Sequence, residues 1–376
     1  MKVLILTLTV GQGHNSTSFA LAQYLETKGA DCIVLDTYKY LNKLIGDTLD
    51  KGYTSIARIS PELNLRMYDR AEKDSSNARQ RKTYFPYTFA EVSKKKMQKF
   101  IEYEMPDVIV CPHIFSAILI TQMKRDGIFT QKIPVLGIVT DFTLHPFWED
   151  TVLDYYIVAN ELLVYTAERK GIHPERILPL GIPVKETFSV DTPASEARAR
   201  LKLKDKMTVL MISSTVGFGN VPELLSDLDN APLDFQVVLI CGHNKRLLKK
   251  IQDSIFNKDI FVKDYVENME LYMDAADCVI TKPGGITVSE ALAKRRPLIV
   301  TDPLPGVENR NIFFLVNNNL AVHAGKYARI DEVLVQLFSQ PERLDQMKHA
   351  QELYGKRHSA KTTGDFIIEL NNLKIK

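Results

Sequence analysis

Residues 279–293, Val-Ile-Thr-Lys-Pro-Gly-Gly-Ile-Thr-Val-Ser-Glu-Ala-Leu-Ala, decide how the second half of the chain folds. The stretch begins at the end of a short apolar run that is rich in β-branched residues, as in a buried strand. The turn at 283–285 ends this strand, and apolar residues return at helical spacing from 288 to 292. A strand, a glycine turn and a helix N-terminus bring unpaired N–H groups and the positive end of the helix dipole together. The stretch therefore predicts an anion site.

Acidic and amide side chains follow this turn. Glu290, about one helical turn into the helix, can accept hydrogen bonds from vicinal hydroxyls such as those of a ribose. The next apolar run ends in a Pro-Leu-Pro-Gly turn, after which come Glu308, Asn309 and Asn311, which suit the hydroxyls of a sugar. A diphosphate between two polyols, as in a nucleotide sugar, fits this order of residues.

Composition limits the class of protein. The chain has 376 residues, of which 45% are hydrophobic and 25% charged, so two soluble globular domains are expected. A net charge of +2 provides no excess of cations for nucleic acid, and none is expected as a partner. The four cysteines lack metal or redox spacing. No apolar run approaches the ~20 residues of a spanning helix. A cytoplasmic protein with free thiols is predicted.

Strand-like runs alternate with amphipathic helical stretches along most of the chain. Residues 2–10, a glycine turn, a helix at 16–28 and a strand at 32–36 predict a β-α-β unit, hence a parallel sheet. A second series of strands begins at Thr208. The predicted fold class is α/β, with two Rossmann-like parallel-sheet domains facing a central cleft and ligands beyond the carboxyl ends of the strands. The predicted divisions are a first domain at 1–185, a linker at 186–205, a second domain at 206–355 and a C-terminal helix at 356–376.

The loop Gly11-Gln-Gly13-His14 has two interpretations. With Asp36 at the end of the second strand it approaches a dinucleotide fingerprint, which would indicate an NAD-type oxidoreductase, although Ser16 replaces the third glycine. Alternatively, His14 lies where the loop meets the helix, and a histidine that is neutral near pH 7 can take a proton from an attacking hydroxyl. His14 is therefore a candidate general base; otherwise it caps the helix or packs.

A second candidate base is Asp141, which follows a buried strand-like run. Loops at strand ends often carry functional carboxylates, so Asp141 is placed in catalysis or acceptor binding, with a turn-capping aspartate as the alternative. His145 and Trp148, the only tryptophan, suit an apolar acceptor channel. Core packing is the alternative for Trp148.

Residues 77–100 differ from their surroundings because aromatic residues are bracketed by cations. This pattern suits a membrane interface, where rings insert among headgroups and each lysine meets anionic lipid at about 1 kcal/mol. The alternative is a solvated basic helix with a loop. The residues predicted to meet the membrane are Tyr84, Phe85, Tyr87, Phe89, Lys94, Lys95 and Lys96.

Weaker signals occur elsewhere in the second half. Residues 213–220, with Gly217 and Gly219, and residues 241–244 each follow a strand, but glycine after a strand is usually only a turn. Lys282 either neutralises leaving-group charge or is a surface lysine. Asp227-Leu-Asp229 matches a pattern that binds Mg²⁺ or Mn²⁺, but it lies away from any strand end. No metal and no cofactor are expected.

Several of these motifs occur together in one known family. They are Thr281-Lys-Pro-Gly-Gly-Ile-Thr-x-x-Glu-Ala, Pro303-x-Pro-Gly-x-Glu308-x-x-Asn311, Gly-x-Gly-His14, Thr140-Asp141 with His-Pro-x-Trp148, Gly181-Ile-Pro183 with Phe188, Cys241-Gly-x-Asn244 and Tyr265-Val266. Over nearly the whole chain they resemble the monogalactosyldiacylglycerol synthase and processive diacylglycerol glucosyltransferase family. The resemblance implies a GT-B fold. It also implies inverting transfer of a hexose from a UDP-sugar to diacylglycerol or glycosyl-diacylglycerol, giving a β-linked glycolipid.

The resemblance also implies roles for individual residues. The Pro-Gly-Gly-x-Thr segment would hold the diphosphate, Glu290 the ribose, and Glu308 and Asn311 would lie near the donor sugar. The predicted donor-binding residues are Gly217, Gly219, Gly242, Asn244, Val266, Lys282, Pro283, Gly284, Gly285, Ile286, Thr287, Glu290, Glu308, Asn309 and Asn311. Those predicted for the acceptor are Gly11, Gly13, His145 and Trp148, with His14 and Asp141 as catalytic residues.

The chain departs from the family pattern at three places. Val307 stands where the family usually has Gln, and Lys294-Arg-Arg replaces the usual glycine before Pro297. The loop at 213–219 is poorer in glycine than the family pattern leads one to expect. The expected partners are a UDP-hexose, the lipid acceptor and an anionic membrane surface, with the protein peripheral on the cytoplasmic face of the membrane. Three alternatives stay open: an N-acetylglucosaminyltransferase acting on a lipid-linked peptidoglycan precursor, a nucleotide-dependent oxidoreductase, and a non-catalytic UDP-sugar sensor.

Overall fold

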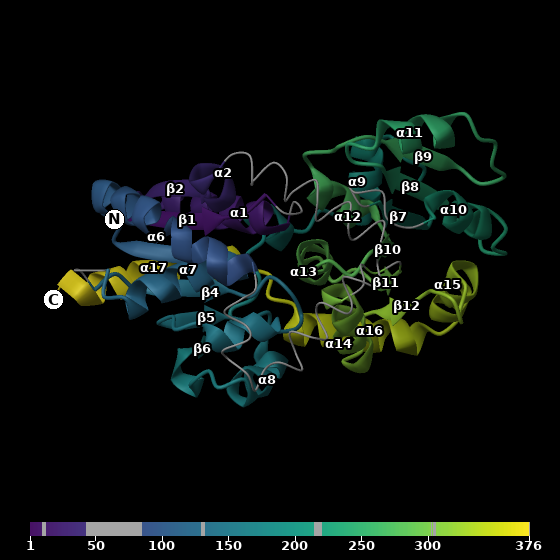
Figure 1. Cartoon of the computed structure of the whole chain (residues 1–376). Coiled ribbons are helices and arrows are strands. Elements are labelled where there is room, and N and C mark those ends of the chain that lie inside the picture. Colours follow the sequence, from purple (N-terminus) through teal and green to yellow (C-terminus); the bar gives the residue numbers. More distant parts are fainter. Residues whose placement is uncertain are drawn as a thin grey trace. The chain divides into compact units, whose positions relative to one another are not determined.

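A computed structural model describes residues 1–9, 13–42, 85–128, 132–213, 220–301, 303 and 306–375, with only the backbone at 85, 86, 374 and 375. The chain divides into two compact units (Figure 1). The first consists chiefly of Met1–Glu186 and His358–Lys376, and the second of Thr187–Leu304 and Glu308–Arg357.

The first unit contains a six-stranded parallel sheet with the order β2-β1-β3-β4-β5-β6. Helices cover both faces of such a sheet, so its central strands are continuous apolar runs, as in Val-Ile-Val-Cys of β3, all buried. The strands are β1 (Lys2–Thr7), β2 (Asp31–Asp36), β3 (Val108–Cys111), β4 (Val135–Ile138), β5 (Tyr155–Ile157) and β6 (Ile177–Leu178).

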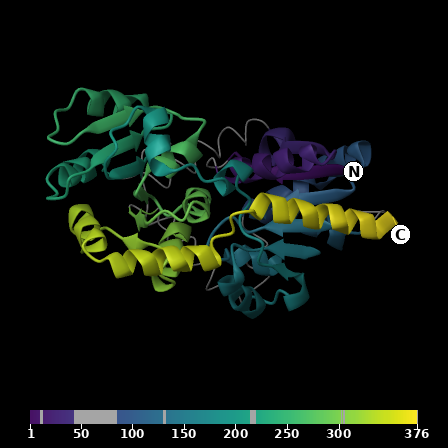
Figure 2. The same ribbon diagram turned by 180° about the vertical axis from the view of Figure 1, so that it is seen from behind.

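The helices of the first unit include the last helix of the chain, α17, drawn in yellow in Figure 2. The Tyr24 hydroxyl of α1 donates a hydrogen bond to Asp365 of α17 at 2.6 Å, and Ile367 is fully buried against α1 and the sheet. The helices are α1 (Gly13–Thr27), α2 (Thr37–Leu41), α6 (Phe85–Glu104), α7 (Ile114–Arg125), α8 (Val164–Arg169) and α17 (Ser359–Ile375), with short 3-10 helices η2 (Pro146–Asp150), η3 (Glu161–Leu163) and η4 (Pro174–Arg176).

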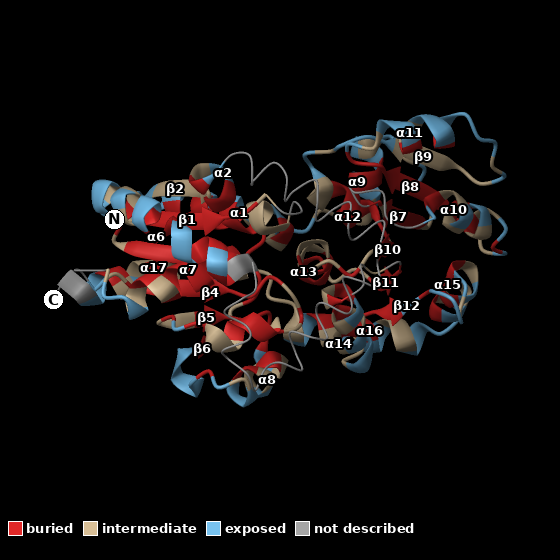
Figure 3. Cartoon of the chain, viewed as in Figure 1, coloured by how far each residue is buried: buried red, intermediate tan, exposed pale blue. Residues whose placement is uncertain are grey.

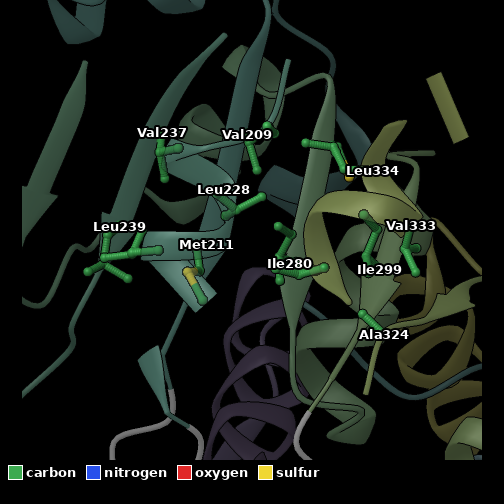
Figure 4. Close-up of a cluster of buried hydrophobic side chains, with 14 of the residues drawn as sticks. Val209, Met211, Leu228, Val237, Leu239, Ile280, Ile299, Ala324, Val333 and Leu334 are labelled. Atoms are coloured by element: carbon green, nitrogen blue, oxygen red, sulfur yellow. The ribbon is translucent and has the colours of Figure 1, made fainter. Parts of the chain in front are cut away.

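The second unit has another six-stranded parallel sheet, with the order β12-β11-β10-β7-β8-β9, which is the strand order of a dinucleotide-binding fold. Figure 4 shows part of its core, where Val209, Ile280 and Ile299 from adjacent strands meet Leu334. The strands are β7 (Thr208–Ile212), β8 (Gln236–Ile240), β9 (Ile260–Lys263), β10 (Cys278–Thr281), β11 (Leu298–Val300) and β12 (Val322–His323).

The helices of the second unit begin within the segment expected to be a linker. Ala197 of α9 and Ala275 of α12 are fully buried in one apolar cluster, and the Arg198 side chain pairs with Asp277 at 2.6 Å. Residues 194–201 are thus built into this unit. Its helices are α9 (Ala194–Leu201), α10 (Val221–Asp229), α11 (Lys245–Gln252), α12 (Met269–Ala275), α13 (Gly285–Ala293), α14 (Val307–Asn317), α15 (Ile330–Phe338) and α16 (Pro341–Tyr354), with η5 (Glu186–Ser189) at the junction.

In each sheet the order of strands reverses once, between β1 and β3 in the first and between β7 and β10 in the second. Ligands of doubly wound sheets bind at this reversal, beyond the carboxyl ends of the strands. The two strands that flank each reversal are almost entirely buried (Figure 3). The segments that follow these strands include His14 and His113 in the first unit and Lys282 in the second. A ligand site is therefore expected at these segments.

Candidate functional site

His14 occupies the first turn of α1, just beyond the carboxyl end of β1, and is partly buried. Its Nδ1 lies 3.1 Å from the main-chain carbonyl oxygen of Pro112 and 3.1 Å from the Thr140 hydroxyl. A carbonyl oxygen only accepts, so Nδ1 carries the proton and the lone pair of the neutral ring is on Nε2. This is the tautomer that a general base needs.

The environment of His14 keeps it neutral. Desolvation by burial disfavours the imidazolium and lowers the pKa of His14 from 6.5 to about 4, although the hydrogen bond to the Pro112 carbonyl acts in the opposite direction. At pH 7 the side chain is therefore an uncharged proton acceptor.

A second histidine, His113, lies against the first and was not among the site residues predicted from the sequence. The two rings meet edge to face, with centroids 4.6 Å apart at 83°. His113 Nδ1 accepts a hydrogen bond from the Phe115 N–H at 3.0 Å and so caps α7. Burial, followed by the charges of His14 and His145, lowers its pKa well below 6.5. Its position directly after the apolar strand β3 was the available signal.

Asp141 lies close to the same place. It directly follows Thr140, whose hydroxyl contacts His14, and its side chain is partly exposed. The carboxyl ends of β1, β3 and β4 therefore bring His14, His113 and the Thr140–Asp141 pair to one edge of the sheet. The role of Asp141, as a second base or as a group that orients His14, stays a prediction.

His145 and Trp148 have structural roles. His145 Nδ1 accepts a hydrogen bond from the Phe147 N–H at 3.2 Å and caps η2. Trp148 is only 4% exposed, lies edge-on to Tyr156, and fills the space beside Gly137, where a Cβ would come within 2.8 Å of its ring. These contacts favour the packing alternative for Trp148, because the absence of a side chain at Gly137 lets the indole enter the core. Its role in an acceptor channel stays a prediction.

Asp36, the acidic residue of the dinucleotide-like pattern, is used by the fold. One carboxylate oxygen accepts from the Lys39 N–H at 3.0 Å and caps α2, and the other accepts from the N–H and hydroxyl of Thr9. Both carboxylate oxygens of Asp36 thus already accept hydrogen bonds from the protein. In a dinucleotide site, the carboxylate at this position accepts hydrogen bonds from a ribose. Gly13 is the first residue of α1. The predicted site residues outside the described part of the chain are Gly11, Gly217, Gly219 and Tyr84.

In the second unit the predicted succession of strand, glycine turn and helix is confirmed. β10 ends at Thr281, Gly284 is the N-cap residue of α13 with extended backbone, and the helix begins at Gly285. A glycine N-cap brings no side chain to the N–H groups of the first turn, which include those of Ile286 and Thr287. The turn therefore has the form of an anion site at a helix N-terminus.

Two links connect this turn to α14. Lys282 Nζ pairs with a carboxylate oxygen of Glu308 at 2.6 Å, and Glu308 is only 7% exposed. Asn311 donates a hydrogen bond to the Pro283 carbonyl at 2.9 Å and is fully buried. In this structure the amide of Asn311 holds the turn, and its predicted contact with the sugar stays a prediction. Asn309 is exposed.

The remaining donor-site candidates follow β8 and β9. Gly242 has φ +55°, which the turn after β8 requires, and Asn244 caps α11 by accepting from the Leu247 N–H at 3.1 Å. The rings of His243 and Tyr265 stack in parallel, 4.7 Å apart, with Tyr265 55% exposed just before Val266.

The acidic pattern of α10 has structural partners. Asp227 pairs with Arg329, and Asp229 accepts from the N–H groups of Asn257 and Lys258. Among the residues that the structure describes, no group of three or more His, Cys, Asp or Glu is arranged to hold a metal ion.

Two aromatic residues of α6 that were predicted to enter a membrane, Tyr87 and Phe89, lie inside the unit. Tyr87 and Phe89 are 6% and 7% exposed, and Phe89 stacks on Phe115 of α7 with ring centroids 5.6 Å apart. Their membrane assignment is therefore corrected: α6 turns this face towards α7, which sequence alone did not indicate. Lys94 is also buried and pairs with Glu91 and Asp126. Lys95 and Lys96 are exposed, and the side chain of Phe85 lies outside the described residues.

Comparison with known proteins connects the two units to glycosyl transfer. Residues 14–184 match the family described as monogalactosyldiacylglycerol (MGDG) synthase, and residues 219–363 match the glycosyltransferase family 28 C-terminal domain. A processive diacylglycerol β-glucosyltransferase of Bacillus cytotoxicus is 31% identical over 99% of this chain and 94% of its own length. One from Bacillus pumilus is 28% identical over 99% of this chain and 96% of its own.

Solved structures share the fold at low identity. MurG of Acinetobacter baumannii superposes with a TM-score of 0.60 at 15% identity, covering 98% of this chain and 99% of that chain. HepE of Anabaena in complex with UDP gives 0.58 at 13% identity, with coverage of 98% and 99%.

Proposed function

Since the chain belongs to the family of the processive diacylglycerol β-glucosyltransferases, we propose that it transfers a hexose from a UDP-sugar to diacylglycerol or a glycosyl-diacylglycerol. It is a glycosyltransferase with the GT-B fold. The observation that carries the proposed chemistry is the neutral His14, whose Nδ1 is bound to the Pro112 carbonyl so that Nε2 holds the lone pair.

The second unit is proposed to hold the donor. The diphosphate caps α13 at Gly284 and Gly285, where the N–H groups and the helix dipole favour negative charge. Glu290 takes the ribose hydroxyls from the second turn of the same helix. Glu308, held by Lys282, takes hydroxyls of the hexose. When UDP departs, its developing charge stays at the helix N-terminus and beside the Lys282 ammonium.

The first unit is proposed to activate the acceptor. His14 Nε2 takes the proton of the acceptor hydroxyl as its oxygen forms a bond to C1 of the hexose. The bond from C1 to the diphosphate oxygen breaks on the opposite face, so the anomeric configuration inverts. Asp141, next to the Thr140 that contacts His14, either orients the reacting groups or stabilises the imidazolium that forms.

The exposed face of α6 is proposed to meet the anionic membrane surface that holds the acceptor. Val92 and Tyr103 are 78% and 79% exposed, and Lys95 and Lys99 lie between them on the same face. Apolar side chains flanking lysines suit an interface of acyl chains and anionic headgroups. None of the helices within the described ranges is long and apolar enough to cross a membrane.

The test is direct synthesis of the product. The protein is incubated with labelled UDP-glucose or UDP-galactose and vesicles that contain diacylglycerol, and lipid extracts are examined for glycolipid. Wild-type protein and His173→Ala, a substitution in an exposed loop, are expected to form product, whereas His14→Ala is expected to form little. Tight UDP binding by calorimetry without glycolipid from any UDP-hexose would contradict transferase activity and favour a sensor.

A further inference from the structure

We propose that His113 is a positioning residue for the base: it holds the ring of His14 in place, excludes water from it and keeps a permanently neutral group beside it. This inference rests on the proposed function, because it concerns how His14 is made ready for proton transfer.

The segment that follows β3 contacts His14 twice. The carbonyl of Pro112 accepts from His14 Nδ1 at 3.1 Å, and the ring of the next residue, His113, lies edge-on to the imidazole at 4.6 Å. The first contact selects the tautomer and the second prevents the ring from tilting. Since both come from consecutive residues of one strand end, any movement of His113 also shifts the carbonyl that selects the tautomer.

The cap of α7 fixes the state of His113 itself. Its Nδ1 accepts from the Phe115 N–H at 3.0 Å, so the neutral ring carries its proton on Nε2. Protonating Nδ1 would break this cap and would place a cation at the positive end of α7. His113 therefore stays neutral where an ordinary histidine would begin to titrate.

The other titratable groups around His14 are few within the described residues. From the loop after β4 come Asp141, beside Thr140, and His145, whose Nδ1 is likewise used to cap a helix. The first turn of α1 holds no acidic residue. Because His113 serves as a cap, it adds no positive charge beside His14, and its ring, 4.6 Å away, helps to bury an imidazole whose pKa is lowered by desolvation.

The test compares two substitutions that separate the ring from the cap. His113→Asn retains an oxygen that can cap α7 but removes the ring. His113→Phe retains a ring but loses the cap.

In His113→Asn, water reaches His14, so the acid limb of the kcat/KM profile is expected to move from about pH 4 towards 6.5. The kcat is expected to fall roughly tenfold to a hundredfold at pH 7, with KM for the UDP-hexose unchanged. His173→Asn is the matched control and should leave both profiles unaltered.

The outcomes distinguish this inference from the proposed function. Full activity of His14→Ala would remove the assignment of the base, whatever His113 does. Loss of activity in His14→Ala combined with a wild-type pH profile and kcat in His113→Asn would overturn the role of His113.

A measurement on the wild-type protein does not depend on how the variants fold. Histidine-specific ¹⁵N NMR should show His14 protonated on Nδ1 and neutral down to about pH 5. Protonation of His14 near pH 6.5 would overturn the inference.

Discussion

Asn311 of α14 donates a hydrogen bond to the main-chain carbonyl of Pro283, 2.9 Å away, and so joins the sugar side of the proposed donor site to its diphosphate side. The Lys282–Glu308 ion pair forms a second link between the same two elements at 2.6 Å. The turn before α13 and the first turn of α14 are consequently held as one structure. A residue can therefore influence donor binding without touching the donor.

Substitution of Asn311 is expected to weaken binding of UDP itself. Asn311→Ala leaves the buried Pro283 carbonyl without this donor, which costs about 1–3 kcal/mol, and it loosens the turn that receives the diphosphate. Calorimetry with UDP and with UDP-glucose should show a similar loss for both. Asn317→Ala, at an exposed position at the other end of the same helix, should change neither.

Glu308→Gln provides the contrasting case. Glu308 is proposed to contact the hexose and not the nucleotide, so its substitution should weaken UDP-glucose binding by roughly tenfold or more while affecting UDP little. Equal losses for both ligands would indicate that Glu308 acts only through Lys282.

The low pKa of His14 predicts that stability depends on pH. Between about pH 6.5 and pH 4 the unfolded chain binds a proton at this histidine and the folded protein does not, so the free energy of unfolding falls as the pH is lowered through this window. The contribution of His14 reaches up to about 3 kcal/mol. Urea unfolding of wild type and His14→Gln at pH 7, 6 and 5 measures it. The stability of the variant should fall less steeply, and parallel curves would contradict the low pKa.

Local sequence was sufficient to predict elements whose determinants lie close together in the chain. The strand at 278–281, the glycine turn at 283–285 and the helix after it follow one another directly, and the structure has this succession. The place of His14 at the start of α1 could be predicted for the same reason, since its strand, loop and helix are consecutive. The α/β class followed from the alternation of strands and helices.

Long-range packing could not be predicted in this way. Phe89 appeared suitable for a membrane because its partner Phe115 belongs to another helix, α7. The hydrogen bond from Asn311 could not be predicted because nothing local indicates that its amide reaches Pro283. His113 was missed because its importance depends on His14, which lies on a different strand end.

The departure from the family pattern at residues 294–296 has a structural consequence that can be measured. Arg295 has φ +52°, a conformation that favours the glycine usual in the family, and Lys294 is fully buried in an ion pair with Asp274 at 2.7 Å. Removing one partner of a buried pair leaves an uncompensated charge, so Lys294→Met should lower the free energy of unfolding by about 3–5 kcal/mol. Urea unfolding provides the measurement.

Lys204→Met, which breaks a largely exposed pair with Asp259, should cost no more than about 1 kcal/mol. A loss below about 1 kcal/mol for Lys294→Met would mean that Arg296, the other cation near Asp274, is sufficient to compensate the charge of this carboxylate.

Membrane contact is proposed for the exposed face of α6, whereas the aromatic residues Tyr87 and Phe89 of the same helix are buried. Lys95 and Lys99 lie on this face, and each lysine near an anionic surface contributes about 1 kcal/mol, so Lys95→Ala/Lys99→Ala should weaken binding to anionic vesicles roughly 30-fold. Flotation with vesicles of increasing anionic lipid content measures this. Lys249→Ala/Lys250→Ala removes the same charge from exposed positions of α11 and should have a much smaller effect. Equal losses in the two double variants would mean that binding follows total charge, and α6 would then not be the membrane-contacting face.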